Sequence, residues 1–220
     1  MKRSLRLFAL TAICLMLAPL SASAGGKFVP LPAENGKSNK LKIRFVRYTG
    51  GSTGKMVIEV QNTGKSSAKF SAKGLFFVPN GNAESAPQRL GAAGPFDDPQ
   101  GQRQEKLTLK PGQKSTLKLQ VFCLDSHRSS PGKSQGFSVA KKRLPKELQR
   151  GIAGGAKGIL KKNKGKMSFD RSNSEIQGHV WKTRNKKWIK LQGERKSEKS
   201  SSGNRRNRIQ RQMLNNSLSN

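Results

Sequence analysis

The sequence predicts a mainly β protein: an immunoglobulin-like antiparallel β-sandwich with one or two C-terminal helices and a disordered basic tail. Two observations lead to this prediction. Short apolar segments recur between about residues 41 and 139, separated by Gly, Pro, Asn and Ser, at the spacing of an antiparallel sandwich. From residue 141 the apolar residues recur every three to four positions, which is typical of an amphipathic helix.

The clearest strand signals lie in segment 107–131. Apolar residues alternate with polar ones over 107–109 and 117–121, so one face of each strand is expected to point inward. Pro111 and Gly112 lie between these runs and suit a bend or reversal of the chain. The four apolar residues of 121–124 (VFCL) then indicate a strand end that is covered on both faces. Residues 125–132 are expected to form an exposed loop.

The preceding segments supply the other strands. Residues 41–48 and 55–60 read as two strands joined by a hairpin-like connection, and 68–78 as a strand pair or one bent strand. Residues 82–106 contain several Pro and Gly and are expected to form a long loop, with room for a short edge strand at 88–90. The total is about six or seven short strands.

The C-terminal part is expected to be helical. Apolar residues between 144 and 160 share one face, and Pro145 suits a first helical turn. Four glycines within 151–158 weaken this helix, so it needs tertiary support. Residues 172–175 (SNSE) have the spacing of a capping box and predict a second short helix that starts there. Residues 188–191 are expected to form a last strand.

Residues 1–24 are expected to be a signal peptide that is cleaved after Ala24. They combine a basic start, an apolar core over 7–20 and a small-residue end, Ala22-Ser23-Ala24. The protein is therefore expected to be secreted or periplasmic. We expect a flexible segment over 25–40, the folded domain over 41–192 and the tail over 193–220. No later segment is long and apolar enough to span a membrane.

The charge is strongly unbalanced. The chain has 44 Lys and Arg against 12 Asp and Glu, a formal net charge of +32. Such an excess attracts polyanions. The leading hypothesis is therefore non-catalytic binding of anionic polymers or surfaces outside the cytoplasm, whether polysaccharide, nucleic acid or lipid headgroups. The alternative is a lysine-rich surface that is simply solvated.

Residues 182–188 carry the best candidates for anion binding. Cations alternate there with polar residues next to two tryptophans, a composition that suits phosphate contact and stacking. The predicted set is Lys182, Arg184, Lys186, Lys187 and Trp188. The alternative is that the tryptophans are packing anchors and the lysines their solvated rim.

Catalytic and metal sites find little support. Asp125, Ser126 and His127 include the side chains of a catalytic triad, but consecutive residues of an extended chain point to alternate sides. The chain has only one other histidine, His179, and neither HxxxH nor CxxC spacing. We therefore expect no metal, no cofactor and no enzymatic activity.

Cys123 is the only cysteine outside the predicted leader. In an oxidising compartment it is expected to pair between chains, to remain buried as an inert thiol, or to take part in chemistry. Its apolar neighbours Phe122 and Leu124 favour burial. A buried thiol without a cationic partner is a weak nucleophile.

Two segments around Cys123 and Gln177 point to a specific chemistry. The run Val121–Asp125 (VFCLD), followed by Glu175–Trp181 (EIQGHVW), resembles the paired signature of bacterial thioester-domain surface proteins. The resemblance implies that the Cys123 thiol and the Gln177 carboxamide condense with loss of ammonia. The implied apolar cover consists of Phe122, Ile176, Val180 and Trp181. The alternative function is therefore an adhesin-like protein that captures amines covalently.

Overall fold

We describe the protein from a computed structural model, which places residues 26–34, 40–50, 54–162, 169–186 and 188–195. The predicted signal peptide and residues 196–220 of the predicted tail lie outside the described residues. Within them the elements are, in order, β1 (Val29–Pro30), β2 (Leu41–Tyr48), β3 (Lys55–Asn62), β4 (Ala68–Phe70), β5 (Phe76–Pro79), β6 (Leu90–Asp97), β7 (Arg103–Gln104), β8 (Leu107–Leu109), β9 (Lys114–Cys123), β10 (Phe137–Val139), α1 (Lys146–Lys162) and α2 (Phe169–Lys186).

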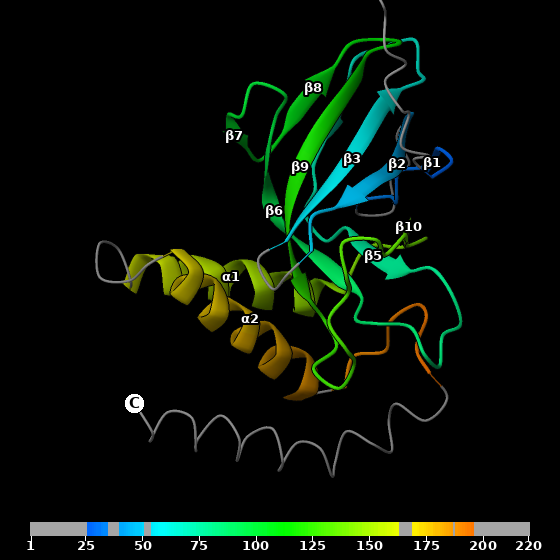
Figure 1. Cartoon of the computed structure of the whole chain (residues 1–220). Helices are drawn as coiled ribbons and strands as arrows, with labels where there is room; N and C mark the ends of the chain where they lie inside the picture. The colour runs from blue at the N-terminus through cyan, green and yellow to red at the C-terminus, as the bar shows by residue number, and fades with distance from the viewer. Residues whose placement is uncertain (1–25, 35–39, 51–53, 163–168, 187, 196–220) are drawn as a thin grey trace, which may run out of the picture.

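One antiparallel sheet dominates the structure (Figure 1). Its strand order is β1-β2-β3-β9-β6-β5-β10, β7 pairs with β6, and β4 and β8 form a separate two-stranded sheet. The large sheet nearly closes on itself because β10 lies beside β2. There the ring of Phe137 meets those of Phe45 and Tyr48 edge to face, with centroids 5.8 and 5.6 Å apart. The prediction of a mainly β protein with C-terminal helices is confirmed.

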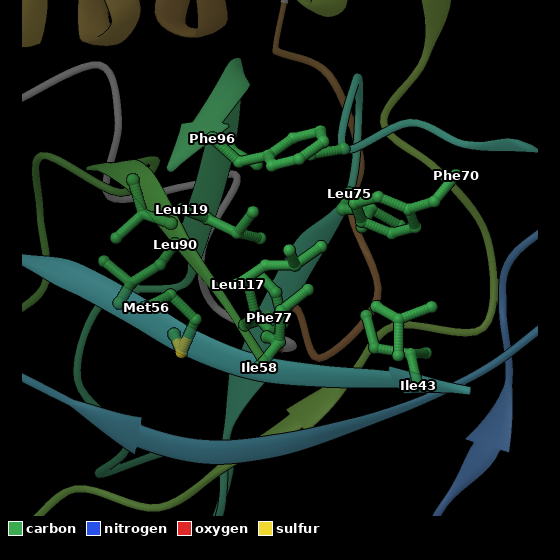
Figure 2. Packing of buried hydrophobic residues seen from close by; sticks show 14 of the residues in the cluster. Ile43, Met56, Ile58, Phe70, Leu75, Phe77, Leu90, Phe96, Leu117 and Leu119 are labelled. Carbon is green, nitrogen blue, oxygen red and sulfur yellow. The ribbon is translucent and has the colours of Figure 1, made fainter. Parts of the chain in front are cut away.

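The core lies between the curved sheet and the β4–β8 pair. Figure 2 shows side chains from β2, β3, β5, β6 and β9 pointing toward one another. The predicted alternation of β9 is confirmed: Leu117, Leu119, Val121 and Cys123 are buried on this side. Phe70 of β4 and Leu109 of β8 are fully buried in the same cluster. The small sheet therefore covers part of the core.

The two helices lie side by side across one end of the sheet (Figure 1). Leu148 and Ile152 of α1 and Ile176 and Val180 of α2 form a second apolar cluster with side chains from β5 and β9. Phe122 belongs to this second cluster, because consecutive residues of a strand point to opposite faces. The helices thus extend the core at the end of β9.

Several element predictions are wrong. Residues 82–106 are not one long loop, because they contain β6 in the middle of the sheet and β7. The segment predicted to be a flexible start contains β1. Helix α2 begins at Phe169, so residues 172–175 lie inside it. Residues 188–191 are described but form no strand.

Candidate functional site

Helix α2 replaces a neighbouring strand along the last part of β9. The pairing of β3 with β9 ends at Lys55 and Gln120, and beyond that pair this edge of β9 is lined by α2. On its other side β9 stays paired with β6, with Leu90 opposite Cys123. The N–H and C=O of Cys123 therefore face the helix.

A row of polar contacts joins the helix to the strand end, and we call it the α2–β9 seam. Gln120 donates to Asn173, Gln177 binds the backbone of Cys123, Arg184 pairs with Asp125, and Asn185 donates to Ser126. Both segments run in the same direction. Twelve helical residues rise about 18 Å and six extended residues about 20 Å, so the two rows stay in register.

The carboxamide of Gln177 contacts both backbone polar groups of Cys123. The N–H of Cys123 donates to Oε1 of Gln177 at 2.8 Å, and Nε2 of Gln177 donates to the carbonyl oxygen of Cys123 at 2.7 Å. Both residues are buried, at 4% and 5% exposed. The amide thus satisfies a strand edge that would otherwise be buried without partners. The contact also brings together the two residues that the sequence marked for thioester formation.

The thiol of Cys123 is neutral at physiological pH. Burial, and next the charge of Asp125, raise its pKa to about 12. Tyr48 lies in the same core cluster, and burial and then the charge of Cys123 raise its pKa to about 12 as well. Cys123 is a free, buried cysteine. The site therefore favours an uncharged sulfur.

The four residues of the predicted cover do not lie on one side of Cys123. Phe122, Ile176 and Val180 are buried in the cluster between the helices and the sheet. Trp181 alone packs against the cluster that holds Cys123, and its Nε1 donates to Oε1 of Gln88 at 3.3 Å. Side chains of the sheet core therefore form most of the apolar surroundings of the thiol.

A buried ion cluster adjoins the site. Asp125 accepts hydrogen bonds from the side chain of Arg89 at 2.8 and 2.6 Å and pairs with Arg184 at 2.8 Å, and all three side chains are 0% exposed. Burial by itself raises the pKa of Asp125, but the hydrogen bonds of Arg89 and the charges of both arginines outweigh it and hold the pKa below its usual range. The prediction that residues 125–132 form an exposed loop is wrong at this position.

The predicted anion-binding residues do not form one surface. Lys182 and Lys186 are exposed, and Lys187 lies outside the described residues. Arg184 is buried against Asp125 and stacks on Trp188 with its Cζ 4.6 Å from the ring centroid, so its predicted role as an anion ligand is wrong. Trp188 donates to Glu194 at 2.5 Å and lies beside the ring of His127. It is a packing anchor here.

Sequence reasoning missed Arg89, Asn173 and the part that Asp125 plays. One signal was present, because Asn173, Gln177 and Arg184 share a helical face with spacings of four and seven. The described residues contain no group of three or more His, Cys, Asp or Glu that could hold a metal ion. No helix among them is long and apolar enough to cross a membrane.

Comparisons of the chain with protein-family models, with curated proteins and with solved structures find no match.

Proposed function

We propose that Cys123 and Gln177 form an internal thioester, with which the protein captures a primary amine of a partner outside the cytoplasm. One observation carries the proposal. The Gln177 carboxamide lies on the backbone of Cys123, although 54 residues separate the two in sequence. The resemblance to thioester-domain proteins rests on this same pair of residues.

The proposed chemistry has two balanced steps. The sulfur of Cys123 attacks Cδ of Gln177, the thiol proton goes to the amide nitrogen, and ammonia leaves. Later the nitrogen of the partner's amine attacks the same carbon, an amide forms, and the C–S bond breaks. The amine's proton goes to sulfur, which restores the thiol. No redox partner is needed.

The surroundings of the pair support the first step and the survival of its product. The backbone N–H of Cys123 points at Oε1 of Gln177, where negative charge develops as the carbon is attacked. The same burial that raises the pKa of Cys123 makes its thiolate a poor leaving group, so both water and an amine react slowly with the thioester. Exclusion of water by the core protects a thioester further.

The hydrogen bonds of Gln177 also anchor α2, so the test must separate anchoring from chemistry. Cys123→Ala removes the thiol but keeps both hydrogen bonds, because they go to the backbone of residue 123. Asn173→Ala weakens the seam at Gln120 and leaves both reacting groups in place.

The experiment incubates the purified protein with dansylcadaverine, a fluorescent primary amine, and follows covalent incorporation on denaturing gels. Wild type and Asn173→Ala are expected to be labelled, while Cys123→Ala and Gln177→Ala are expected to remain unlabelled at any salt concentration. Equal labelling of wild type and Cys123→Ala, or labelling of neither, would contradict the proposal.

A second candidate function is the binding of anionic polymers. The net charge of +32 favours it, and so does the exposure of Lys182 and Lys186, which are four residues apart on one face of α2. Such binding is expected to weaken steeply as salt rises and to survive Cys123→Ala. These two properties distinguish it from covalent capture.

Two finer predictions from the sequence stay proposals. We infer export from the leader pattern of residues 1–24, and a relationship to immunoglobulin-like sandwiches from the strand spacing. N-terminal sequencing of the secreted protein, which should begin at Gly25, tests the first.

A further inference from the structure

A basic pocket lies beside the helical end of the sheet, and neither Cys123 nor Gln177 lines it. It has a volume of about 400 Å³ and opens between β5, the segment before α1 and residues 190–192. That volume is at the small end of the range for ligand pockets.

The walls of the pocket are tied to the rest of the fold. The buried Arg89 donates to the carbonyl oxygens of Leu191 and Gln192 at 3.3 and 3.1 Å. The backbone N–H of Lys141 donates to Oε1 of Gln192 at 2.8 Å, and Ala140 donates to the carbonyl oxygen of Phe76 at 3.0 Å. The pocket is therefore formed before any ligand arrives.

The pocket combines positive charge with an apolar base. Lys141, Lys142 and Lys190 line it and are exposed, whereas Phe76 and Leu191 are 3% and 5% exposed. Arg143 also lines it but donates to the carbonyl oxygens of Pro32 and Ser71 at 3.0 and 3.1 Å. It contributes charge more than free hydrogen-bond donors. The lining contains no acidic side chain.

These features fit a ligand with an anionic group and a ring that has an apolar face. Three exposed ammonium groups suit a carboxylate or a sulfate, and the C–H face of a sugar ring suits the exposed ring of Pro145, which lines the pocket together with the nearly covered Phe76 and Leu191. We propose that this pocket binds an acidic sugar unit, one that carries a carboxylate or a sulfate. The inference gives a site to the second function proposed above and does not depend on the thioester.

The test compares two triple variants of the full chain that lose the same charge. Lys141→Ala/Lys142→Ala/Lys190→Ala removes the pocket cations, and Lys65→Ala/Lys69→Ala/Lys110→Ala removes three exposed lysines elsewhere. Calorimetry measures binding of tetragalacturonate, a chondroitin sulfate tetrasaccharide, neutral maltotetraose and tripolyphosphate. The first two separate carboxylate from sulfate recognition.

We expect at least one acidic tetrasaccharide to bind wild type and the control variant, and the pocket variant to bind it at least about tenfold more weakly. Wild type is expected to bind maltotetraose and tripolyphosphate at least about tenfold more weakly than it binds that acidic tetrasaccharide. Equal losses in the two variants, equal binding of tripolyphosphate, or no binding of either acidic tetrasaccharide would overturn the pocket assignment.

Long polygalacturonate separates failure of the pocket from failure of the general function. If both variants bind the polymer equally well while the tetrasaccharide result is negative, general attraction to anionic polymers stands and the pocket assignment falls. If even wild type does not bind the polymer, both fall.

Discussion

The carboxylate of Asp125 is completely buried, and the two arginines beside it compensate for the loss of its hydration. Desolvation of an ion costs several kcal/mol, and this cost is offset by the charge and hydrogen bonds of Arg89 and by the charge of Arg184. Because Asp125 comes two residues after Cys123, the ion cluster fixes where the chain goes directly after the candidate site.

Asp125→Asn is expected to destabilise the fold by about 3–5 kcal/mol, since it leaves two buried guanidinium groups without their counter-charge. The urea midpoint of unfolding measures this loss. The matched control is Asp97→Asn, whose partners Lys55 and Arg103 are 47% and 52% exposed at their side chains. The control should cost about 1 kcal/mol or less. Similar costs for both variants would contradict the structural role of the ion cluster.

The buried thiol of Cys123 gives a prediction about alkaline pH. In the unfolded chain the thiol releases its proton near its ordinary pKa of 9.0, but in the folded protein only near 12. Between these values the folded state binds more protons, so the stability of thiol-bearing protein falls as pH rises above about 9, by at most about 1.4 kcal/mol per pH unit.

Urea unfolding of amine-treated wild type and of Cys123→Ala, compared at pH 7 to 10, measures this effect. Both proteins keep Tyr48, whose pKa is raised mainly by burial, so most of the difference between them reports the thiol. Protein with an intact thioester has no thiol to titrate, so its stability should change with pH in the same way as that of Cys123→Ala. If the free energies of unfolding of thiol-bearing protein and the variant differed by a constant amount from pH 7 to 10, the thiol would not be shielded from solvent in the folded state.

At the scale of elements, α1 and α2 pack closely because two glycines of α1 contact side chains of α2. A Cβ on Gly155 would lie 2.0 Å from Cδ2 of His179, and one on Gly151 would lie 2.3 Å from Cγ2 of Thr183. His179 also places Nε2 2.9 Å from the carbonyl oxygen of Gly151. The glycines that weaken the helix thus allow it to pack.

Gly155→Ala is expected to destabilise the protein by about 1–3 kcal/mol, because the methyl group has no room beside the His179 ring. Gly154→Ala serves as the control, since a Cβ there meets nothing within 4 Å. It should stabilise the helix by up to about 1 kcal/mol. Thermal unfolding of the two variants gives the comparison, and a loss of similar size for both would contradict this packing.

How well the sequence predicted an element depended on how local its signal was. β2, β3 and β9 were predicted because their own residues carry the signal, as alternation in β2 and β9 and as a short apolar run in β3. β6 (LGAAGPFD) was missed because it has little alternation and contains Pro95. It is a strand because it pairs with β9, with an irregular register between Ala92 and Phe96.

In the candidate site, too, the residues with a local sequence signal were predicted and those without one were missed. Cys123 and Gln177 were recognised because each lies in a short motif of its own. The partners of Asp125 could not be read locally, since Arg89 lies 36 residues before it and Arg184 belongs to α2. For the same reason Arg184 was predicted to be a surface cation. It is buried because it pairs with Asp125, which only the tertiary fold brings next to it.

At the scale of the whole molecule, the candidate sites lie near one end of the sheet. The Cys123–Gln177 contact and the buried ion cluster lie where α2 meets β9, and the basic pocket opens beside β5 and the segment before α1. Arg89 links two of them, because it binds Asp125 and also the carbonyl oxygens of Leu191 and Gln192. The large excess of basic residues would draw an anionic partner toward this protein.

The most direct measurement is the intact mass of the purified, leader-free protein before and after exposure to methylamine. We expect a mass that is lower than the sequence mass by one ammonia. Methylamine should then raise it by the mass of one methylamine and expose one thiol, that of Cys123, to alkylation. A mass equal to that of the plain sequence, unchanged by methylamine and with a free thiol from the start, would contradict the thioester.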